Sequence, residues 1–452
     1  MTSTKILRRI GVAVGSLALL STGATGLAAA QESAEGLDTS SSVSGSAEYR
    51  GSTGFKLSED LVLHPRLDLE GGYQNNVFFE DDSETPVGSP ILRIGVGASL
   101  ATHDRRNEVA PKVALNADVQ LIWNQYLSDN SSASKQSDLG INALAGMNVN
   151  PEGKVTFELR DGFTRSVNPP PVETSRELAR DKNELVAGLV LKPGGGALQF
   201  YGNVTWTFDR FENQSLGFAD RNSVIGAVGT KWQWLPKTQL NGEASYGLVS
   251  SDSPVKPGGN STPLRVTVGT STLITPSFGT VLRLGYGNSF YSRGGNYGSY
   301  LALAELRYAI GPMLRLAGGY SRDFADSLIG NYRVDDSFFA RFSAQLAGHF
   351  LLGAKAQLSL RKYDGLPTMG STIFCNSVTC SPSNASPTRD DVLFSASANA
   401  DYQVNEWLTF GALYQLYSDN TKFVATSQMA GAQPDSLGFV WQEIVVKATA
   451  NY

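Results

Sequence analysis

Apolar and polar residues alternate at every second position along most of the chain after residue 60. Between 394 and 402, for example, Phe394, Ala396, Ala398, Ala400 and Tyr402 occupy one face, and only Ser, Asn and Asp stand between them. A period of two residues is that of a β-strand, whose successive side chains point to opposite faces. We find no sustained helical period in this part of the chain. The pattern therefore predicts an all-β protein.

About 18 segments with this pattern follow one another, and turns rich in Gly, Pro, Asn and Ser separate them. The predicted strands lie at 61–79, 90–103, 112–127, 137–150, 154–168, 181–193, 198–212, 221–235, 238–251, 261–274, 279–293, 297–310, 313–326, 332–347, 349–364, 390–404, 407–421 and 437–452. An even number of antiparallel strands of this length is typical of bacterial outer-membrane barrels. A soluble all-β fold is the alternative.

The predicted connections mostly alternate between short and long from the second strand onward. Short ones include NPEG at 150–153 and LPK at 235–237, whereas EDDSETPVGS at 80–89 is long; ATHDRRNEVAP at 101–111 is long where a short turn is expected. Transmembrane barrels have short periplasmic turns and longer extracellular loops, and only a closed barrel leaves no backbone group unpaired in hydrocarbon. We therefore predict a transmembrane, antiparallel up-and-down β-barrel over residues 61–452, integral to the outer membrane of a Gram-negative cell.

The N-terminus has the features of a cleavable signal peptide. MTSTKILRR is basic, IGVAVGSLALLSTGATGL is apolar with small residues, and Ala28–Ala30 precede a polar segment. An uncleaved membrane anchor is the less favoured alternative, because the unbroken apolar stretch is shorter than the roughly 20 residues that a spanning helix needs. We predict a signal peptide over 1–30 and a short periplasmic N-terminal segment, rich in Ser and Gly, over 31–60.

Charged and polar residues occupy the strand face opposite the Leu, Val, Ala and aromatic residues. Charges at this depth in a membrane need water or a partner, and a barrel of roughly 18 strands can hold an aqueous lumen. The predicted lumen-lining path consists of Arg265, Arg283, Arg307, Arg315, Arg341, Lys355, Arg361, Tyr363, Trp407, Tyr417 and Lys447. Its aromatic rings suit the apolar faces of sugars and its arginines suit acidic sugars; simple filling of the lumen is the alternative.

The last segment ends the chain on an aromatic residue. Ile444, Val446 and Tyr452 share its apolar face, and Lys447 lies on the other. We predict that this strand pairs with the strand near Leu61 and closes the barrel. The apolar positions and the terminal aromatic would then form the signal that the barrel assembly machinery recognises.

Charge and candidate chemistry exclude several functions. The net charge of −5 disfavours a nucleic-acid partner. Cys375 and Cys380 lie close together in an exported chain, which predicts a loop disulfide rather than a metal site. His64, His103 and His349 belong to no evident catalytic motif. We expect no enzyme activity, no metal and no cofactor.

The first quarter of the chain resembles the outer-membrane β-barrel porin family that accompanies exopolysaccharide biosynthesis, including myxobacterial members. That family has a GY-x-N-N-x-F strand, a P-x-L/I strand, a Tyr/Trp-rich strand and an N-P-x-G-K turn. The matching residues are Gly72, Tyr73, Asn75, Asn76, Phe78, Ile91, Leu92, Trp123, Tyr126 and Asn150–Lys154.

The resemblance implies the outer-membrane step of Wzx/Wzy-type polysaccharide secretion, by a passive barrel that carries an exopolysaccharide, capsule or spore-coat polymer. The implied partners are outer-membrane lipids, a periplasmic polysaccharide export protein and an inner-membrane co-polymerase. Two alternatives remain: a general or substrate-selective diffusion porin, and an outer-membrane scaffold or adhesin that presents the cysteine loop.

Overall fold

The computed structural model describes residues 54–58, 61–81, 85–102, 111–166, 173, 179–212, 220–251, 256, 258–366, 373–375, 378–382, 389–427 and 434–452. The predicted signal peptide and most of the segment 31–60 lie outside these ranges. The side chains of Cys375 and Cys380 also lie outside what is described, so the disulfide stays a prediction.

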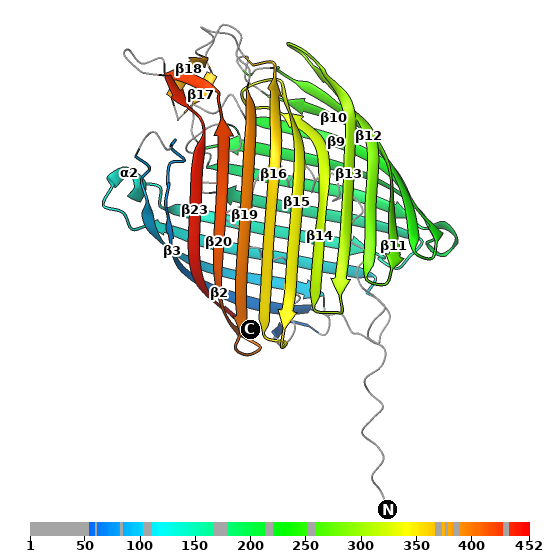
Figure 1. Cartoon of the computed structure of the whole chain (residues 1–452). Coiled ribbons are helices and arrows are strands. Elements are labelled where there is room, and N and C mark those ends of the chain that lie inside the picture. Colours follow the sequence, from blue (N-terminus) through cyan, green and yellow to red (C-terminus); the bar gives the residue numbers. More distant parts are fainter. Residues whose placement is uncertain are drawn as a thin grey trace, which may run out of the picture.

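The chain forms a closed antiparallel barrel (Figure 1). One sheet contains 19 strands, of which β1 is a two-residue addition and the other 18 form the wall. The wall strands are β2 (Leu61–Gln74), β3 (Ser89–Thr102), β4 (Val113–Tyr126), β5 (Asp138–Val149), β6 (Val155–Ser166), β7 (Arg180–Leu191), β8 (Leu198–Phe211), β9 (Arg221–Leu235), β10 (Thr238–Ser250), β11 (Ser261–Thr275), β12 (Phe278–Tyr291), β13 (Tyr297–Ile310), β14 (Leu314–Asp326), β15 (Tyr332–Leu346), β16 (Phe350–Asp364), β19 (Asp390–Gln403), β20 (Leu408–Thr421) and β23 (Phe439–Asn451). Each predicted strand is confirmed, with ends that differ by a few residues.

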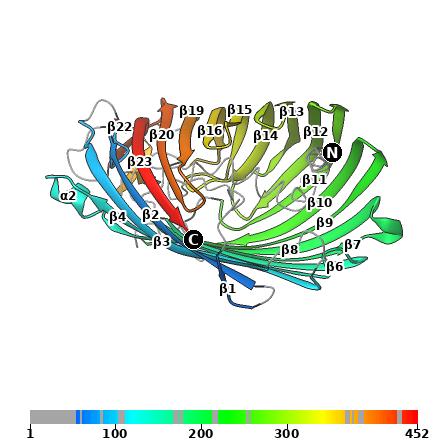
Figure 2. The same cartoon turned by 90° about the horizontal axis from the view of Figure 1, so that it is seen from below.

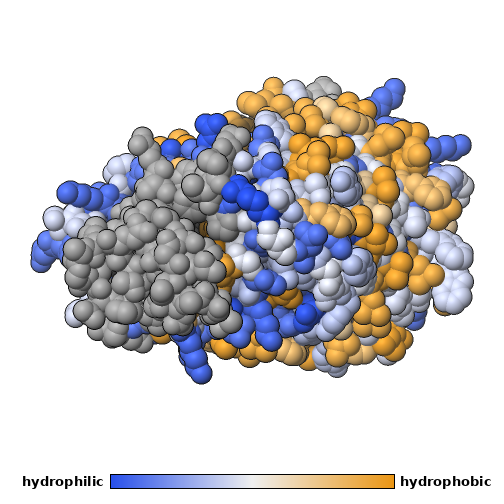
Figure 3. All heavy atoms as spheres, turned by 90° about the horizontal axis from the view of Figure 1, so that it is seen from above, coloured by the Kyte–Doolittle hydropathy of each residue, from blue (hydrophilic) through white to orange (hydrophobic). Residues whose placement is uncertain are grey.

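The two faces of the wall differ as the alternating pattern predicts. Leu67 and Leu69 are about half exposed on the outside of β2, whereas Asp68 between them is 4% exposed on the inside. Seen from the loop end, apolar residues gather along the outer edge (Figure 3). A wall with no open edge and an apolar outer face satisfies both requirements of a bilayer. The chain is therefore an outer-membrane β-barrel. Within the described residues, no helix is long and apolar enough to cross a bilayer.

The barrel closes where β2 pairs with β23, a seam that runs from Arg66 opposite Asn451 to Gln74 opposite Glu443. This pairing confirms that the last strand closes the barrel, while its role as an assembly signal stays a prediction. Below the seam, β1 (Phe55–Lys56) pairs with β2 where β23 has ended (Figure 2). The edge of β2 is therefore covered almost along its whole length.

Several residues of the family-like motif build this seam. Gly72 packs against β23 so closely that a Cβ atom would lie 2.1 Å from the Ile444 carbonyl oxygen. Asn75 donates its amide hydrogen to the Gln442 carbonyl and accepts the Gln442 amide hydrogen on its side chain. The Asn76 side chain donates to the Val440 and Glu80 carbonyls and accepts from the Glu80 amide. These residues hold the barrel closed and shape the start of the next connection.

The lengths of the connections distinguish the two ends of the barrel. Short turns such as 236–237 and 276–277 lie at the end where the chain terminates, and the longest connections lie at the opposite end, the mouth (Figure 1). Two mouth connections, 292–296 and 327–331, are nevertheless only five residues long. The remaining elements are α2 (Ser131–Ser134), the 3-10 helix η1 (Pro193–Gly195), and a small sheet above the mouth made of β17 (Ile373–Cys375), β18 (Val378–Pro382), β21 (Val424–Ser427) and β22 (Pro434–Ser436).

Candidate functional site

The side chains of the predicted path lie on the inner face of the wall, apart from Trp407, which is in the short turn between β19 and β20 and is about half exposed. Ion pairs across this face join strands that are not neighbours. Arg265 on β11 contacts Asp323 on β14 at 3.5 Å, and Lys447 on β23 contacts Asp401 on β19 at 2.9 Å. The remaining path residues separate into two groups at different heights.

The lower group, here called the basic row, lies on neighbouring strands toward the short turns and consists of Arg283, Arg307, Arg315, Arg341 and Lys355. Arg307 is opposite Ala317, Ala317 is opposite Arg341, and Arg341 is opposite Lys355, so three of its cations share one level of β13 to β16. The Arg307 and Arg341 side chains are 53% and 51% exposed.

The basic row has little compensating charge at its own height on these strands. Arg307 forms an ion pair with Glu305, and Arg341 lies 4.0 Å from the other oxygen of the same carboxylate. One carboxylate thus serves two guanidinium groups. On β6, in contrast, the exposed inner positions carry both Glu158 and Arg160. The lower part of β12 to β16 is therefore a positive wall that faces the lumen.

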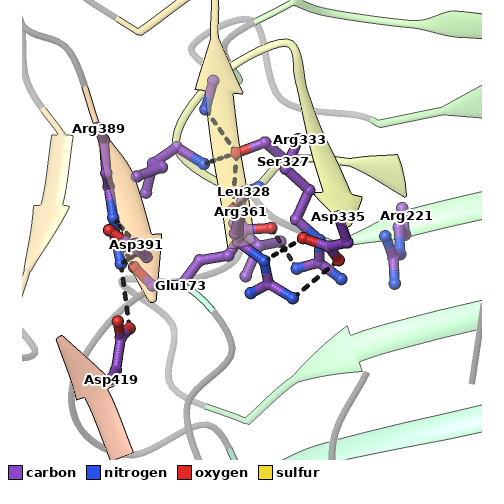
Figure 4. Close-up of polar contacts among 12 residues, drawn as sticks. Glu173, Arg221, Ser327, Leu328, Arg333, Asp335, Arg361, Arg389, Asp391 and Asp419 are labelled. Carbon is purple, nitrogen blue, oxygen red and sulfur yellow. Dashed lines mark hydrogen bonds and ion pairs between the residues drawn. The ribbon is translucent and has the colours of Figure 1, made fainter. Parts of the chain in front are cut away.

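The upper group belongs to a buried network beneath the mouth, here called the mouth cluster. Its members are Glu173, Arg333, Asp335, Arg361, Arg389, Asp391 and Asp419 (Figure 4). All are at most 6% exposed. Charges buried to this extent are stable only when they are paired and hydrogen-bonded.

Two ion pairs anchor the mouth cluster to the wall. Arg361 on β16 binds Asp335 on β15 with two hydrogen bonds, of 2.6 Å from Nε and 3.0 Å from Nη2. Arg389 binds Asp391 at 2.7 Å and lies 3.5 Å from Asp419. Bidentate contacts between a guanidinium and a carboxylate fix orientation as well as distance. The first of these pairs leaves the charge of the neighbouring Arg333 available for another partner.

That partner is Glu173, which comes from the connection between β6 and β7. Its carboxylate accepts hydrogen bonds from Arg333 Nη1 at 2.6 Å, from Ser327 Oγ at 2.7 Å and from the Leu328 amide at 2.6 Å. Its backbone carbonyl accepts a further bond of 2.6 Å from Arg389 Nη1. Eight strands lie between β6 and β15 in either direction around the wall. Glu173 therefore contacts the side of the barrel opposite to its own strands (Figure 4).

A lysine in another mouth connection adds to this electrostatic environment. Lys256, between β10 and β11, is 4% exposed. Burial lowers the pKa of its ammonium group, while the Asp326 and Glu173 carboxylates act in the opposite direction and Arg221 adds to the lowering. The alternating pattern of the sequence points to neither Glu173 nor Lys256, because a single charged residue in a polar loop carries no periodic signal.

The aromatic residues of the predicted path do not form a row of open ring faces. The Arg389 guanidinium covers the Tyr363 ring at 4.6 Å. Tyr417 stacks on Phe439 at 5.7 Å in a buried cluster that also contains Phe79 and Trp441. Phe79 belongs to the connection between β2 and β3, which thus folds inward against the wall. The path changes from buried and paired near the mouth to exposed and basic below it.

The comparisons with known proteins give only distant structural likenesses. No protein-family model matches this chain, and no curated protein matches it. Similar solved structures are OccAB4 of Acinetobacter baumannii, with 12% identity over 88% of this chain and 100% of that one (TM-score 0.46), and the outer membrane protein OpdK of Pseudomonas aeruginosa, with 11% identity over 86% and 99% (TM-score 0.46). The siderophore receptor PirA of Pseudomonas aeruginosa follows with 10% identity over 86% and 80% (TM-score 0.42). Likeness at this level says nothing about substrates, which must be argued from the chain itself.

Proposed function

We propose that the protein is a passive diffusion channel of the outer membrane that favours small anionic solutes. The contact of Glu173 with Ser327, Leu328 and Arg333 carries the proposal. It holds a residue of the connection between β6 and β7 against β15 on the opposite side of the wall, and so places part of the chain within the mouth. A small hydrated solute can pass beside such a contact. A polysaccharide chain would need an opening that stays as wide as the polymer for as long as it is being secreted, and this contact takes up part of the mouth.

The basic row supports the preference for anions. Its exposed cations face the lumen, and a channel wall of one charge sign within a low-dielectric medium concentrates ions of the opposite sign. Arg307, Arg341 and Lys355 share one level of this wall, and Arg307 and Arg341 share the carboxylate of Glu305. Solutes that pass the mouth would therefore meet a positive surface before they reach the periplasm.

Polysaccharide export with a periplasmic export protein and an inner-membrane co-polymerase is the second candidate. The family-like motif favours it, but Gly72, Asn75 and Asn76 contact the seam and the start of a connection rather than the basic row. Barrel closure alone accounts for these residues. The covered rings of Tyr363 and Tyr417 also offer a sugar chain no continuous stacking surface.

Ion selectivity in planar bilayers tests the proposal. The purified barrel, placed in a KCl gradient, should conduct and show a reversal potential on the chloride-selective side. The triple variant Arg307→Ala, Arg341→Ala, Lys355→Ala should move that potential toward potassium. Lys362→Ala is the matched control, because Lys362 lies on β16 like Lys355 but on the other face. A barrel that does not conduct, or a triple variant with unchanged selectivity, would contradict the proposal.

A deletion strain separates the two candidates. Loss of a secreted polymer with unchanged uptake of small anions would favour export. Slower uptake of small anions with normal polymer secretion is the result that the diffusion channel requires.

A further inference from the structure

The environment of the Glu173 carboxylate is a complete binding site for a carboxylate group. Its two oxygens receive three donors: a guanidinium, a hydroxyl and a backbone amide. Hydrogen bonds of 2.6 to 2.7 Å, one of them from a charged group, are at the short end of the range for proteins. Arg333 belongs to the wall, and the other two donors belong to the connection 327–331. Glu173 belongs to neither, because it comes from the connection between β6 and β7.

The donors are oriented without help from Glu173. Ser327 Oγ accepts hydrogen bonds from the Ile329 amide at 3.2 Å and the Gly330 amide at 3.0 Å, which turns its own hydrogen toward the carboxylate. The Leu328 amide belongs to the same five-residue turn, 327–331. This turn therefore presents two donors in a fixed geometry, and preorganised donors bind an anion with little reorganisation.

The third donor is fixed by the wall. Arg333 is 2% exposed, and its Nε lies 3.7 Å from Asp335 Oδ2. Asp335 in turn is held by the two hydrogen bonds from Arg361, so the carboxylate of Asp335 is already neutralised. The positive charge of Arg333 is thus directed to whichever carboxylate occupies the site.

We propose that Ser327, the Leu328 amide and Arg333 form a binding site at the mouth for the carboxylate of a passing solute, and that Glu173 is a tethered competitor for this site. The inference rests on the proposed diffusion function and names its substrate class as solutes that bear a carboxylate. A tethered group acts at an effective concentration on the order of millimolar. A solute must therefore be abundant or make additional contacts in order to replace Glu173, which gives the channel its selectivity.

The carboxylate could come from a small acid or from an acidic sugar polymer, and the same site would recognise both. Three probes distinguish these sources: glucuronate, an oligomer of galacturonate, and glucose as the uncharged partner of glucuronate. Glucose carries an uncharged hydroxymethyl group at the position where glucuronate carries its carboxylate, so the comparison isolates the contribution of the charged group.

Calorimetric titration of the full-length barrel in detergent tests the site without requiring conductance. Glu173→Ala should bind glucuronate at least about tenfold more tightly than the wild type, because it lacks the tethered competitor. Glucose should bind neither protein. Adding Arg333→Met to Glu173→Ala should abolish the binding, and this substitution leaves the Arg361–Asp335 pair in place. Heat-modifiable migration checks that each variant is folded, and Glu173→Gln replaces Glu173→Ala if the alanine variant is not.

Equal affinity of the wild type and the Glu173 variants for glucuronate would overturn the proposal, as would binding that survives Arg333→Met. If only the galacturonate oligomer bound, the proposal that the site takes small solutes would be overturned. Because the readout is binding, a barrel that fails to conduct in bilayers would contradict the proposed function and not this site.

Discussion

A lysine at Val446 tests whether the alternating pattern of the closing strand is a membrane pattern. Val446 is 63% exposed on the outer face of β23, where its backbone pairs with Gly71 on β2 and Ala412 on β20. The next residue, Lys447, points to the inner face and contacts Asp401 at 2.9 Å. The protein therefore already tolerates this charge one position away, and only the face distinguishes the two sites.

The expected loss of stability depends on how deep Val446 lies in the bilayer. Val446 is the eighth residue of the strand Phe439–Asn451, which has 13 residues, so it lies close to the middle of the wall. A lysine on the lipid face costs about 2–4 kcal/mol at the bilayer midplane and roughly 0–1 kcal/mol near the interfaces. We expect Val446→Lys to lower the free energy of unfolding by about 2–4 kcal/mol, the midplane value. The native valine is largely exposed, so lost packing within the protein adds little.

Urea titration of the barrel folded into phospholipid vesicles, followed by heat-modifiable migration, measures this loss. Val446→Thr is the first control, since it keeps the branched shape without a charge. Thr449→Lys is the second, because Thr449 faces inward and donates a hydrogen bond of 2.7 Å to Asp68, which would accept the new ammonium group. Equal stability of Val446→Lys and Val446→Thr, or an equally large loss in Thr449→Lys, would refute the assignment of faces.

Three further predictions concern the seam, the mouth and the cysteine loop. Deleting Tyr452 removes a ring whose centroid is 4.6 Å from that of Phe55, and it removes an amide hydrogen bond of 3.1 Å to the Pro65 carbonyl. Pulse-chase labelling should therefore show slower barrel assembly than for a one-residue deletion in the connection 365–389. Equal rates would contradict this. Asp335→Asn leaves Arg361 and Arg333 without their shared carboxylate and should cost about 3–5 kcal/mol in urea titration, whereas Asp181→Asn at the partly exposed pair with Arg165 should cost under about 1 kcal/mol. Finally, Cys375 and Cys380 should resist alkylation until a reductant is added, and labelling of both thiols in the untreated protein would exclude the disulfide.

The strands and their faces could be predicted from the sequence because both are local properties. In a strand the side chain alternates between faces at every residue, so Val446 and Lys447 are assigned to opposite faces as soon as the strand is recognised. The bilayer strengthens the pattern, since lipid requires apolar residues on one face along every strand. Closure followed from the same reasoning, because a transmembrane sheet cannot leave the strand that ends at Asn451 with a free edge.

Tertiary structure alone decided which charges act together. Glu173 and Arg333 are 160 residues apart, and no periodic pattern relates a residue of one connection to a residue on the opposite wall. The predicted path separated into a buried mouth cluster and an exposed basic row for the same reason. Alternation assigns both Arg361 and Arg341 to the inside of the barrel. Only the packing at the mouth determines which of the two side chains still faces water. The sequence by itself determined a membrane barrel with a charged interior, and the packing of its connections decided which of those charges are buried in pairs and which face water.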